Sequence, residues 1–160
     1  MSQKLKILLH CDDRRRDAVT MWALSLLLQD RGYNVLVSNR TTLNRFSRWF
    51  DPDIMILSHC FIGFSPEGIA AKSKRARILV LPTEGMILEP ANAISSYAGA
   101  SPEKGREERR AYTAHVTRFL AWGDAGRRFV VDEGIYDEDQ VAVVGNPRFD
   151  VYRSGYFDDL

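Results

Sequence analysis

The segment LKILLHCDDRRRDAVTMWALSLLLQDRGYNVLVS, residues 5–38, contains a complete strand, helix and second strand. Leu5 to His10 is a run of aliphatic residues typical of a buried strand. Asp17 to Asp30 is expected to form a helix that ends at Arg31-Gly32, because glycine commonly follows the last helical turn. Tyr33 to Ser38 is the second strand. Neither strand alternates polar and apolar residues, which favours parallel strands covered on both faces.

The same pattern continues along the chain, so the sequence predicts a doubly wound α/β domain with a Rossmann-like, mainly parallel sheet of six or so strands. We assign residues 1–144 to this domain. The longest irregular connection is expected over Thr83 to Ala100, where a functional loop would fit. The further helices are expected at residues 43–50, 66–76, 101–116 and 124–133, and the further strands at residues 53–58, 77–81, 118–122 and 140–144.

Composition excludes several classes of protein. The 160 residues are 45% hydrophobic and 27% charged, as in globular domains, and the net charge is +1. This balance does not provide the basic field that nucleic-acid-binding proteins use, so no nucleic-acid partner is expected. Cys11 and Cys60 are read as structural thiols, and a disulfide framework is not expected. The N-terminus does not resemble a signal peptide, and we expect a cytoplasmic protein, with peripheral attachment to the inner membrane left open.

The loop after the first strand, HCDDRRRDA, contains no glycine. A dinucleotide site would require glycines there, so nicotinamide and flavin cofactors are not expected, and neither is any other cofactor. Asp12 and Asp13 are followed by three arginines at the start of a helix, where the helix dipole and free N–H groups favour an anion. The alternative is that Asp13 caps the helix and the arginines are solvated.

The following helix is apolar on nearly all sides. Nine of the eleven residues from Ala18 to Leu28 are apolar, and the exceptions, Thr20 and Ser25, lie about 140° apart around the helix. A helix on the surface of a sheet should have one apolar stripe. The pattern therefore leaves two alternatives, contact with a second domain or subunit, or deep burial within the domain.

Two loops at the carboxyl ends of strands carry candidate catalytic residues. His59 follows the third strand and could transfer a proton near neutral pH, although a structural histidine is the alternative. Glu84 follows the fourth strand and could act as a general base, a nucleophile or a hydrogen-bond acceptor, with Gly85 allowing a sharp turn. An exposed turn glutamate is the alternative. The sequence has no His/Cys cluster with metal-ligand spacing, so no metal site is expected.

Four segments together resemble a known family. KILLHCDDRRRDAVTMWALSLLLQDRGYNVLVSN, LPTEG, FLAWGDAGRRFV and QVAVVGNPRFDVYR are similar, in order and spacing, to the N-terminal half of bacterial surface-carbohydrate biosynthesis proteins. These are two-domain GT-B glycosyltransferases, related to CDP-glycerol glycerophosphotransferases and to nucleotide-sugar 2-epimerases. The most specific part is AWGD followed about twenty residues later by VVGNPRFD. Asp12 departs from the glutamate that relatives often have.

The resemblance implies that the chain is the acceptor-side half of a GT-B fold. A second domain or partner subunit would hold the nucleotide-sugar donor, and the acceptor would be a glycan or a lipid-linked glycan. Residues 145–160 would begin the linker to the second domain. The chain would then be part of a longer enzyme or one half of a split enzyme, and it would be inactive alone. The positions that match the family motifs are Arg16, Glu84, Gly85, Asn146, Pro147, Arg148 and Asp150.

We therefore expect a glycosyltransferase domain that acts on a growing bacterial surface polysaccharide. Glu84 and His59 are the expected catalytic residues, while Asp12, Arg16, Gly85, Asn146 and Arg148 would bind acceptor or donor. A nucleotide-sugar 2-epimerase half is one rival. A receiver-like binding module is the other, although such a module needs an aspartate where this chain has Ser58-His59.

Overall fold

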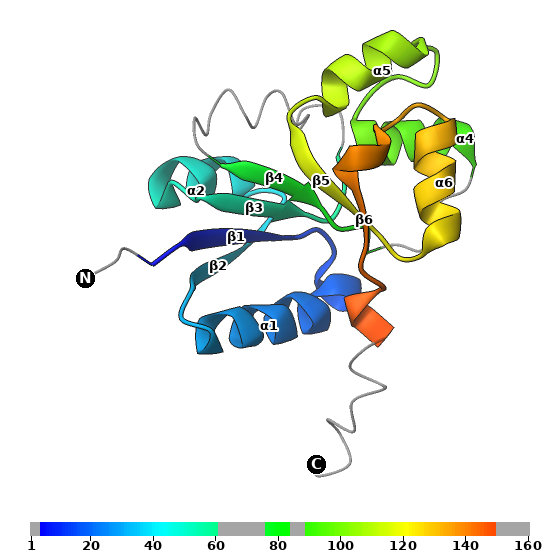
Figure 1. Ribbon diagram of the computed structural model, residues 1–160. Coiled ribbons are helices and arrows are strands. Elements are labelled where there is room, and N and C mark those ends of the chain that lie inside the picture. The colour runs from blue at the N-terminus through cyan, green and yellow to red at the C-terminus, as the bar shows by residue number, and fades with distance from the viewer. Residues whose placement is uncertain (1–3, 61–75, 84–88, 150–160) are drawn as a thin grey trace.

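The computed structural model describes residues 4–60, 76–83 and 89–149 (Figure 1). Its centre is a six-stranded, all-parallel sheet with the strand order β2-β1-β3-β4-β5-β6. The predicted Rossmann-like α/β fold is thereby confirmed. The strands are β1 (Lys6–Cys11), β2 (Asn34–Asn39), β3 (Ile54–Leu57), β4 (Arg77–Val80), β5 (Val116–Ala121) and β6 (Val141–Val143).

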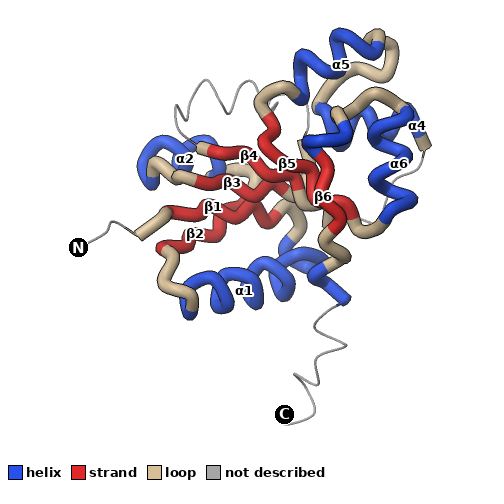
Figure 2. Tube along the Cα trace, in the orientation of Figure 1, coloured by secondary structure: helices blue, strands red, loops and turns tan. Residues whose placement is uncertain are grey.

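Five α-helices are described between these strands (Figure 2). Two short helical segments accompany them: a π-helix, Ile94–Ala98, continues directly from α4, and a 3-10 turn, Glu138–Gln140, precedes β6. The α-helices are α1 (Arg14–Asp30), α2 (Leu43–Phe50), α4 (Pro90–Ala93), α5 (Arg106–Thr113) and α6 (Asp124–Asp132).

Helix α1 begins earlier than its hydrophobic pattern predicts. We expected the first helical residue to be Asp17, but the helix begins at Arg14. The Asp13 carboxylate accepts hydrogen bonds from the backbone N–H groups of Arg15 (2.7 Å) and Arg16 (3.1 Å), which satisfies two donors of the first turn. The capping role considered for Asp13 is therefore confirmed, and the arginines belong to the helix.

The sheet separates two apolar clusters. The larger one includes Phe119 of β5 and Val130 of α6, together with residues of α2, the π-helix and the segment after α6. The smaller cluster lies on the other face and combines strand residues such as Leu9 with Met21 of α1. Among the described helices, α1 alone contributes to this smaller cluster, and Figure 2 shows it lying apart from the other helices.

The connection between β4 and β5 differs most from the prediction. A helix was expected over residues 101–116, but α5 begins only at Arg106, after the extended backbone of Gly105. Lys104 N–H bonds to the Ser101 carbonyl at 3.1 Å, so the Ser-Pro-Glu start forms a turn instead. Val116 is buried and already belongs to β5. The region expected to be irregular, residues 83–100, contains α4 and the π-helix.

The last strand is shorter than the predicted range 140–144. Gly145 then has a φ of 82°, a left-handed conformation that favours glycine, and Pro147 begins a helical turn. The helix predicted at residues 66–76 falls almost entirely outside the described residues. Within the described part, no helix is long and apolar enough to cross a membrane.

Candidate functional site

The site lies where the strand order reverses. From β1 the chain crosses to β2 on one side of the sheet and then returns to β3 on the other, so β1 and β3 flank the switch point. Ligands of open α/β sheets bind beyond the carboxyl ends of the strands at this point. The polar residues His10, Asp12, Ser58 and His59 occur here, at the ends of β1 and β3.

The Ser58 hydroxyl lies between two histidines. Its Oγ is 3.0 Å from His10 Nδ1 and 3.1 Å from His59 Nδ1. Because a hydroxyl has a single proton, it can donate to at most one of the two rings. In one arrangement Ser58 donates to His59 Nδ1, and a neutral His59 then carries its proton on Nε2. In the other arrangement Ser58 donates to His10. His59 can then donate from Nδ1–H to Ser58, which leaves its Nε2 unprotonated and able to act as a base. The bridge therefore links the tautomers of the two histidines.

His10 is the buried member of this pair. Its side chain has no solvent exposure, and burial, reinforced by the nearby His59, lowers the pKa of His10 to about 4. His10 is therefore neutral at pH 7 and serves as a fixed hydrogen-bonding group. His59, whose side chain is 19% exposed, is the imidazole that a ligand could reach.

Two charged residues approach His59 from the loop after β1 and the start of α1. Asp12 Oδ2 is 3.9 Å from His59 Nε2 and 3.6 Å from an Arg16 guanidinium nitrogen. Asp12 therefore places a negative charge on the Nε2 side of the His59 ring. The side chains of Asp12, Arg16 and His59 are each about one-fifth exposed, which leaves part of each accessible to a ligand.

Arg16 is held in place by Asp17. The guanidinium donates two hydrogen bonds to the Asp17 carboxylate, at 2.7 and 3.0 Å, and Asp17 also accepts from the Asp13 backbone N–H. Burial acts to raise the pKa of Asp17, but the hydrogen bonds from Arg16 and Asp13 outweigh it and hold that pKa below its usual value. The bidentate contact fixes the orientation of Arg16 beside Asp12.

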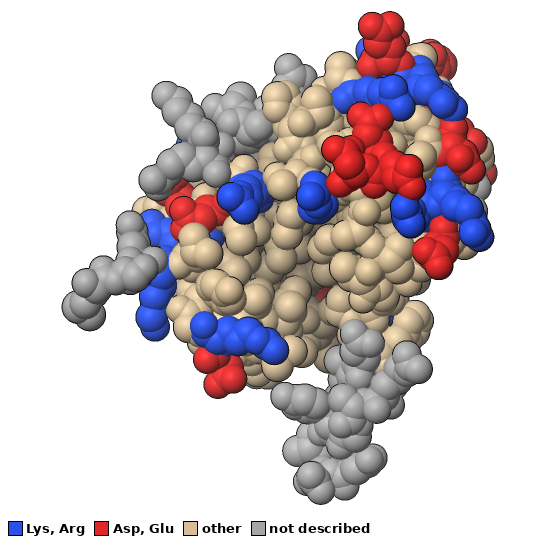
Figure 3. All heavy atoms as spheres, viewed as in Figure 1, with Lys and Arg blue, Asp and Glu red and all other residues tan. Residues whose placement is uncertain are grey.

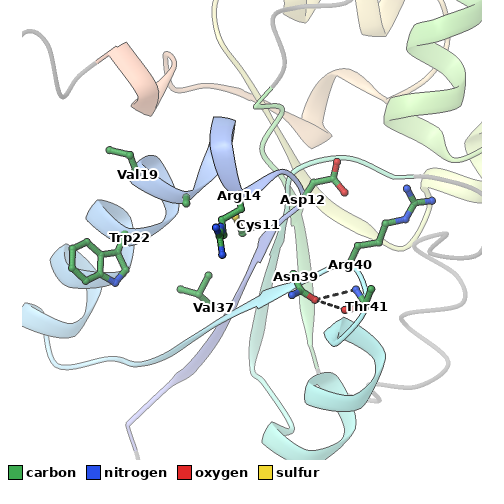
Figure 4. Close-up of a pocket in the computed structure, with 10 residues that line it drawn as sticks. Cys11, Asp12, Arg14, Val19, Trp22, Val37, Asn39, Arg40 and Thr41 are labelled. Carbon is green, nitrogen blue, oxygen red and sulfur yellow. Dashed lines mark hydrogen bonds between the residues drawn. The ribbon is translucent and has the colours of Figure 1, made fainter.

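A hollow of ≈ 690 Å³ opens beside this cluster, between α1 and the end of β2 (Figure 4). Its volume is within the range of small-molecule sites. In Figure 4, Trp22 and Val19 of α1 and Val37 of β2 form one part of the wall, while Asp12 and Arg40 lie at the far end. The lining residues are Cys11, Asp12, Arg14, Ala18, Val19, Trp22, Val37, Asn39, Arg40 and Thr41.

The polar end of the hollow is rigid. The Asn39 side-chain oxygen accepts hydrogen bonds from Thr41 N (3.1 Å), Thr41 Oγ1 (2.8 Å) and Thr42 N (3.0 Å), which orders the turn after β2. Arg14 and Arg40 bring positive charge to a mostly apolar wall. The hollow can therefore receive a ligand with an apolar part and an anionic or hydroxyl-rich part.

The structure brings together three of the predicted site residues, His59, Asp12 and Arg16. Glu84 and Gly85 lie outside the described residues. Asn146 and Arg148 follow β6, which is three strands away from β3 in the sheet. Asn146 is buried and its side-chain oxygen accepts from the Arg148 N–H at 3.0 Å, whereas the Arg148 side chain is exposed.

The end of the described chain nevertheless returns toward α1. Figures 1 and 4 both show the turn at Pro147–Phe149 beside the first turns of this helix. Phe149 packs edge to face on Trp122, with ring centroids 6.1 Å apart. Within the described residues, the buried Asn146 Nδ2 has no hydrogen-bond partner. A role for Asn146 or Arg148 in binding stays a prediction.

Sequence reasoning did not single out His10, Ser58 or Asp17 as site residues, and of the residues of the hollow it considered only Asp12 and Arg14. His10 was treated only as the last residue of a strand, and Ser58 as the end of another. The available signal was that polar residues follow two apolar strands, β1 and β3. Only the order of the strands in the sheet shows that these two strands are neighbours.

Comparison with known proteins returned no match: no protein-family model, curated protein or solved structure matches this chain. The resemblance to GT-B glycosyltransferases therefore rests on the sequence motifs and stays a prediction. Within the described residues, no group of three or more His, Cys, Asp or Glu side chains is placed to hold a metal ion.

Proposed function

We propose that this chain is the acceptor-side domain of a GT-B glycosyltransferase that transfers a sugar from a nucleotide sugar to a growing bacterial surface polysaccharide. The observation that carries the proposal is the arrangement of His59 between Ser58 and Asp12 at the switch point of the sheet. The motif resemblance and the Rossmann-like fold agree with this function.

In this reaction His59 would accept the proton of the acceptor hydroxyl. As the hydroxyl oxygen bonds to the anomeric carbon of the donor sugar, the bond from that carbon to the nucleotide diphosphate breaks. Asp12 would stabilise the resulting imidazolium, and Ser58 would hold the ring through Nδ1. Glu84 is the second proposed catalytic residue, while Arg16 and the adjacent hollow would position the acceptor.

The donor would be bound by a second domain or subunit, and the chain alone would be inactive. Asn146 and Arg148, at the end of β6, would lie where the chain crosses toward that second domain. This division follows from the family resemblance.

The test is sugar transfer by the complete two-domain enzyme. Replacing His59 with Asn should lower kcat by about 100-fold or more, the usual contribution of a general base. The matched control is His115→Asn, because His115 is exposed and lies outside the site. Near-normal turnover of a folded His59→Asn enzyme would contradict the proposed base. Epimerised nucleotide sugar without any transferred sugar would instead identify the epimerase alternative.

A further inference from the structure

Helix α1 presents apolar side chains to solvent on its outer face, and two of them, Val19 and Trp22, also form the edge of the hollow. Val19, Trp22 and Leu26 are 63%, 69% and 53% exposed. Their spacing of three and four residues places them in one line along the helix. We call these three residues the α1 stripe. In Figure 3, charges of both signs gather over the region of α5 and α6, whereas the part of the α1 area left uncovered by grey atoms carries charge mainly near one end.

The inner side of α1 mixes apolar and polar residues: Met21 is buried in the smaller cluster, and Leu24 and Leu28 pack against it. Asp17, Thr20 and Ser25 are buried, whereas the α1 stripe is exposed. A helix that packs on a sheet ordinarily has a single apolar side, whereas α1 has apolar residues on both its inner and its outer side. A line of large apolar residues on the outer face is typical of a surface that another protein covers. The described fold therefore rules out deep burial of this face within the domain.

Opposite charges flank the α1 stripe at equal distances. Arg15 lies four residues before Val19, and Asp30 lies four residues after Leu26. Both side chains are exposed, and within the described residues neither forms an ion pair. The order along the helix is thus a positive charge, three apolar residues and a negative charge. Such an order is complementary to itself when reversed.

We propose that α1 packs antiparallel against α1 of a second copy of this chain. The two-fold axis would pass between positions 22 and 23, with the two Trp22 rings beside it. Val19 would then contact Leu26 of the second copy, and Arg15 would pair with Asp30 of the second copy, each contact occurring twice. The four-three-four spacing from Arg15 to Leu26 is that of a helix-packing seam, and a two-fold dimer uses one self-complementary patch.

The charge order distinguishes a second copy from other occupants. A ligand or an unrelated domain would require an apolar surface but would not require Arg15 and Asp30 to be equidistant from the centre of the α1 stripe. Arg14 and Arg31 lie on other sides of the helix, because they are offset by about 100° or more from the centre of the stripe. Like charges therefore do not meet in the antiparallel arrangement.

The test is the mass of the full 160-residue chain in sedimentation equilibrium over a wide concentration range. We expect an increase from 18.2 kDa toward twice that value. Trp22→Glu should raise the dimer dissociation constant by about 100-fold or more, because it removes the central indole of each copy and buries a carboxylate beside the two-fold axis. Trp49→Glu is the matched control, since Trp49 of α2 is 75% exposed and lies away from the stripe. A chain that remains monomeric throughout, or a dimer that survives Trp22→Glu, would overturn the proposal.

Charge reversal tests the register. Arg15→Asp or Asp30→Arg alone should weaken the dimer by about tenfold, because like charges would then face each other, and the double reversal should restore it. Each change places a charge that suits the helix dipole at its end of α1, so loss of helix stability would not explain weaker association. Equal dimerisation by the single and double variants would overturn the antiparallel register.

Discussion

Helices α1 and α6 differ in how they divide polar and apolar residues between the sheet and solvent. In α6, Val130 is fully buried, Phe129 is partly buried, and the charged Arg128 faces solvent. In α1, Asp17 and other polar residues are buried, and the α1 stripe faces solvent. The difference teaches that α6 divides cleanly into an apolar inner side and a charged outer side, whereas α1 contributes to the core, the site and an apolar outer surface.

The polar residues on the inner side of α1 have a local reason. Asp17 holds Arg16 beside Asp12 and accepts the Asp13 backbone N–H, so it supports both the start of the helix and the site. Thr20 and Ser25 reduce the apolar area that α1 can bury against the sheet. We therefore expect the α1 side of the sheet to contribute less to stability than the α6 side.

The largest effect on the free energy of unfolding is expected from a leucine-to-alanine substitution, made once on each side of the sheet. Leu57 is buried in the cluster on the α6 side, and Leu79 of the neighbouring strand is partly buried on the α1 side. Leu57→Ala should lower the free energy of unfolding by about 4 kcal/mol. Leu79→Ala should cost only about 1 to 2 kcal/mol, because less apolar area leaves water. Urea denaturation measures both, and equal losses would show that the two sides are equally well covered.

An intermediate effect is expected from pH at the end of β1. The unfolded chain protonates His10 near its ordinary pKa of 6.5, but the folded chain does so only near pH 4. Acidification through this window therefore favours unfolding, and the free energy of unfolding should fall by about 2 kcal/mol between pH 7 and pH 5. Urea denaturation at the two pH values measures the loss. His10→Gln should be less sensitive to pH, and an unchanged pH dependence in that variant would contradict a neutral, buried His10.

The smallest effect is expected on the outer face of α1. Trp22→Ser should change the free energy of unfolding by less than about 0.5 kcal/mol when measured at concentrations where the chain is monomeric, because the indole is already solvated. Thermal denaturation of dilute protein measures this change. A loss comparable with that of Leu57→Ala would mean that Trp22 packs within its own domain, and the contrast between α1 and α6 would fail.

The strands were predictable because each is a short aliphatic run, and parallel pairing followed from the lack of alternation. Boundaries set by caps and turns were harder. The pattern of α1 placed its start at Asp17, although the Asp13 side chain begins the helix at Arg14. The Ser-Pro-Glu start of residues 101–103 was a good helix signal, but the turn closed by Lys104 delays α5 to Arg106.

The site was only partly predictable. His59 and Asp12 were recognised because each follows a strand. The contact between Ser58 and His10 spans 48 residues and depends on β1 pairing with β3, which the sequence does not specify. The exposure of Trp22 also required the structure, because the apolar pattern of α1 allowed either burial or contact with a second body.

The strand order also has a consequence for synthesis on the ribosome. After β1, each strand joins an open edge of the sheet already made: β2 on one side, then β3, β4, β5 and β6 in succession on the other. Among the described strands, none has to insert between two that are already paired. Each new strand can therefore pair with the edge strand that was synthesised before it as the chain emerges. The last described strand to join is β6, whose three residues leave few unpaired backbone groups with which another chain could pair.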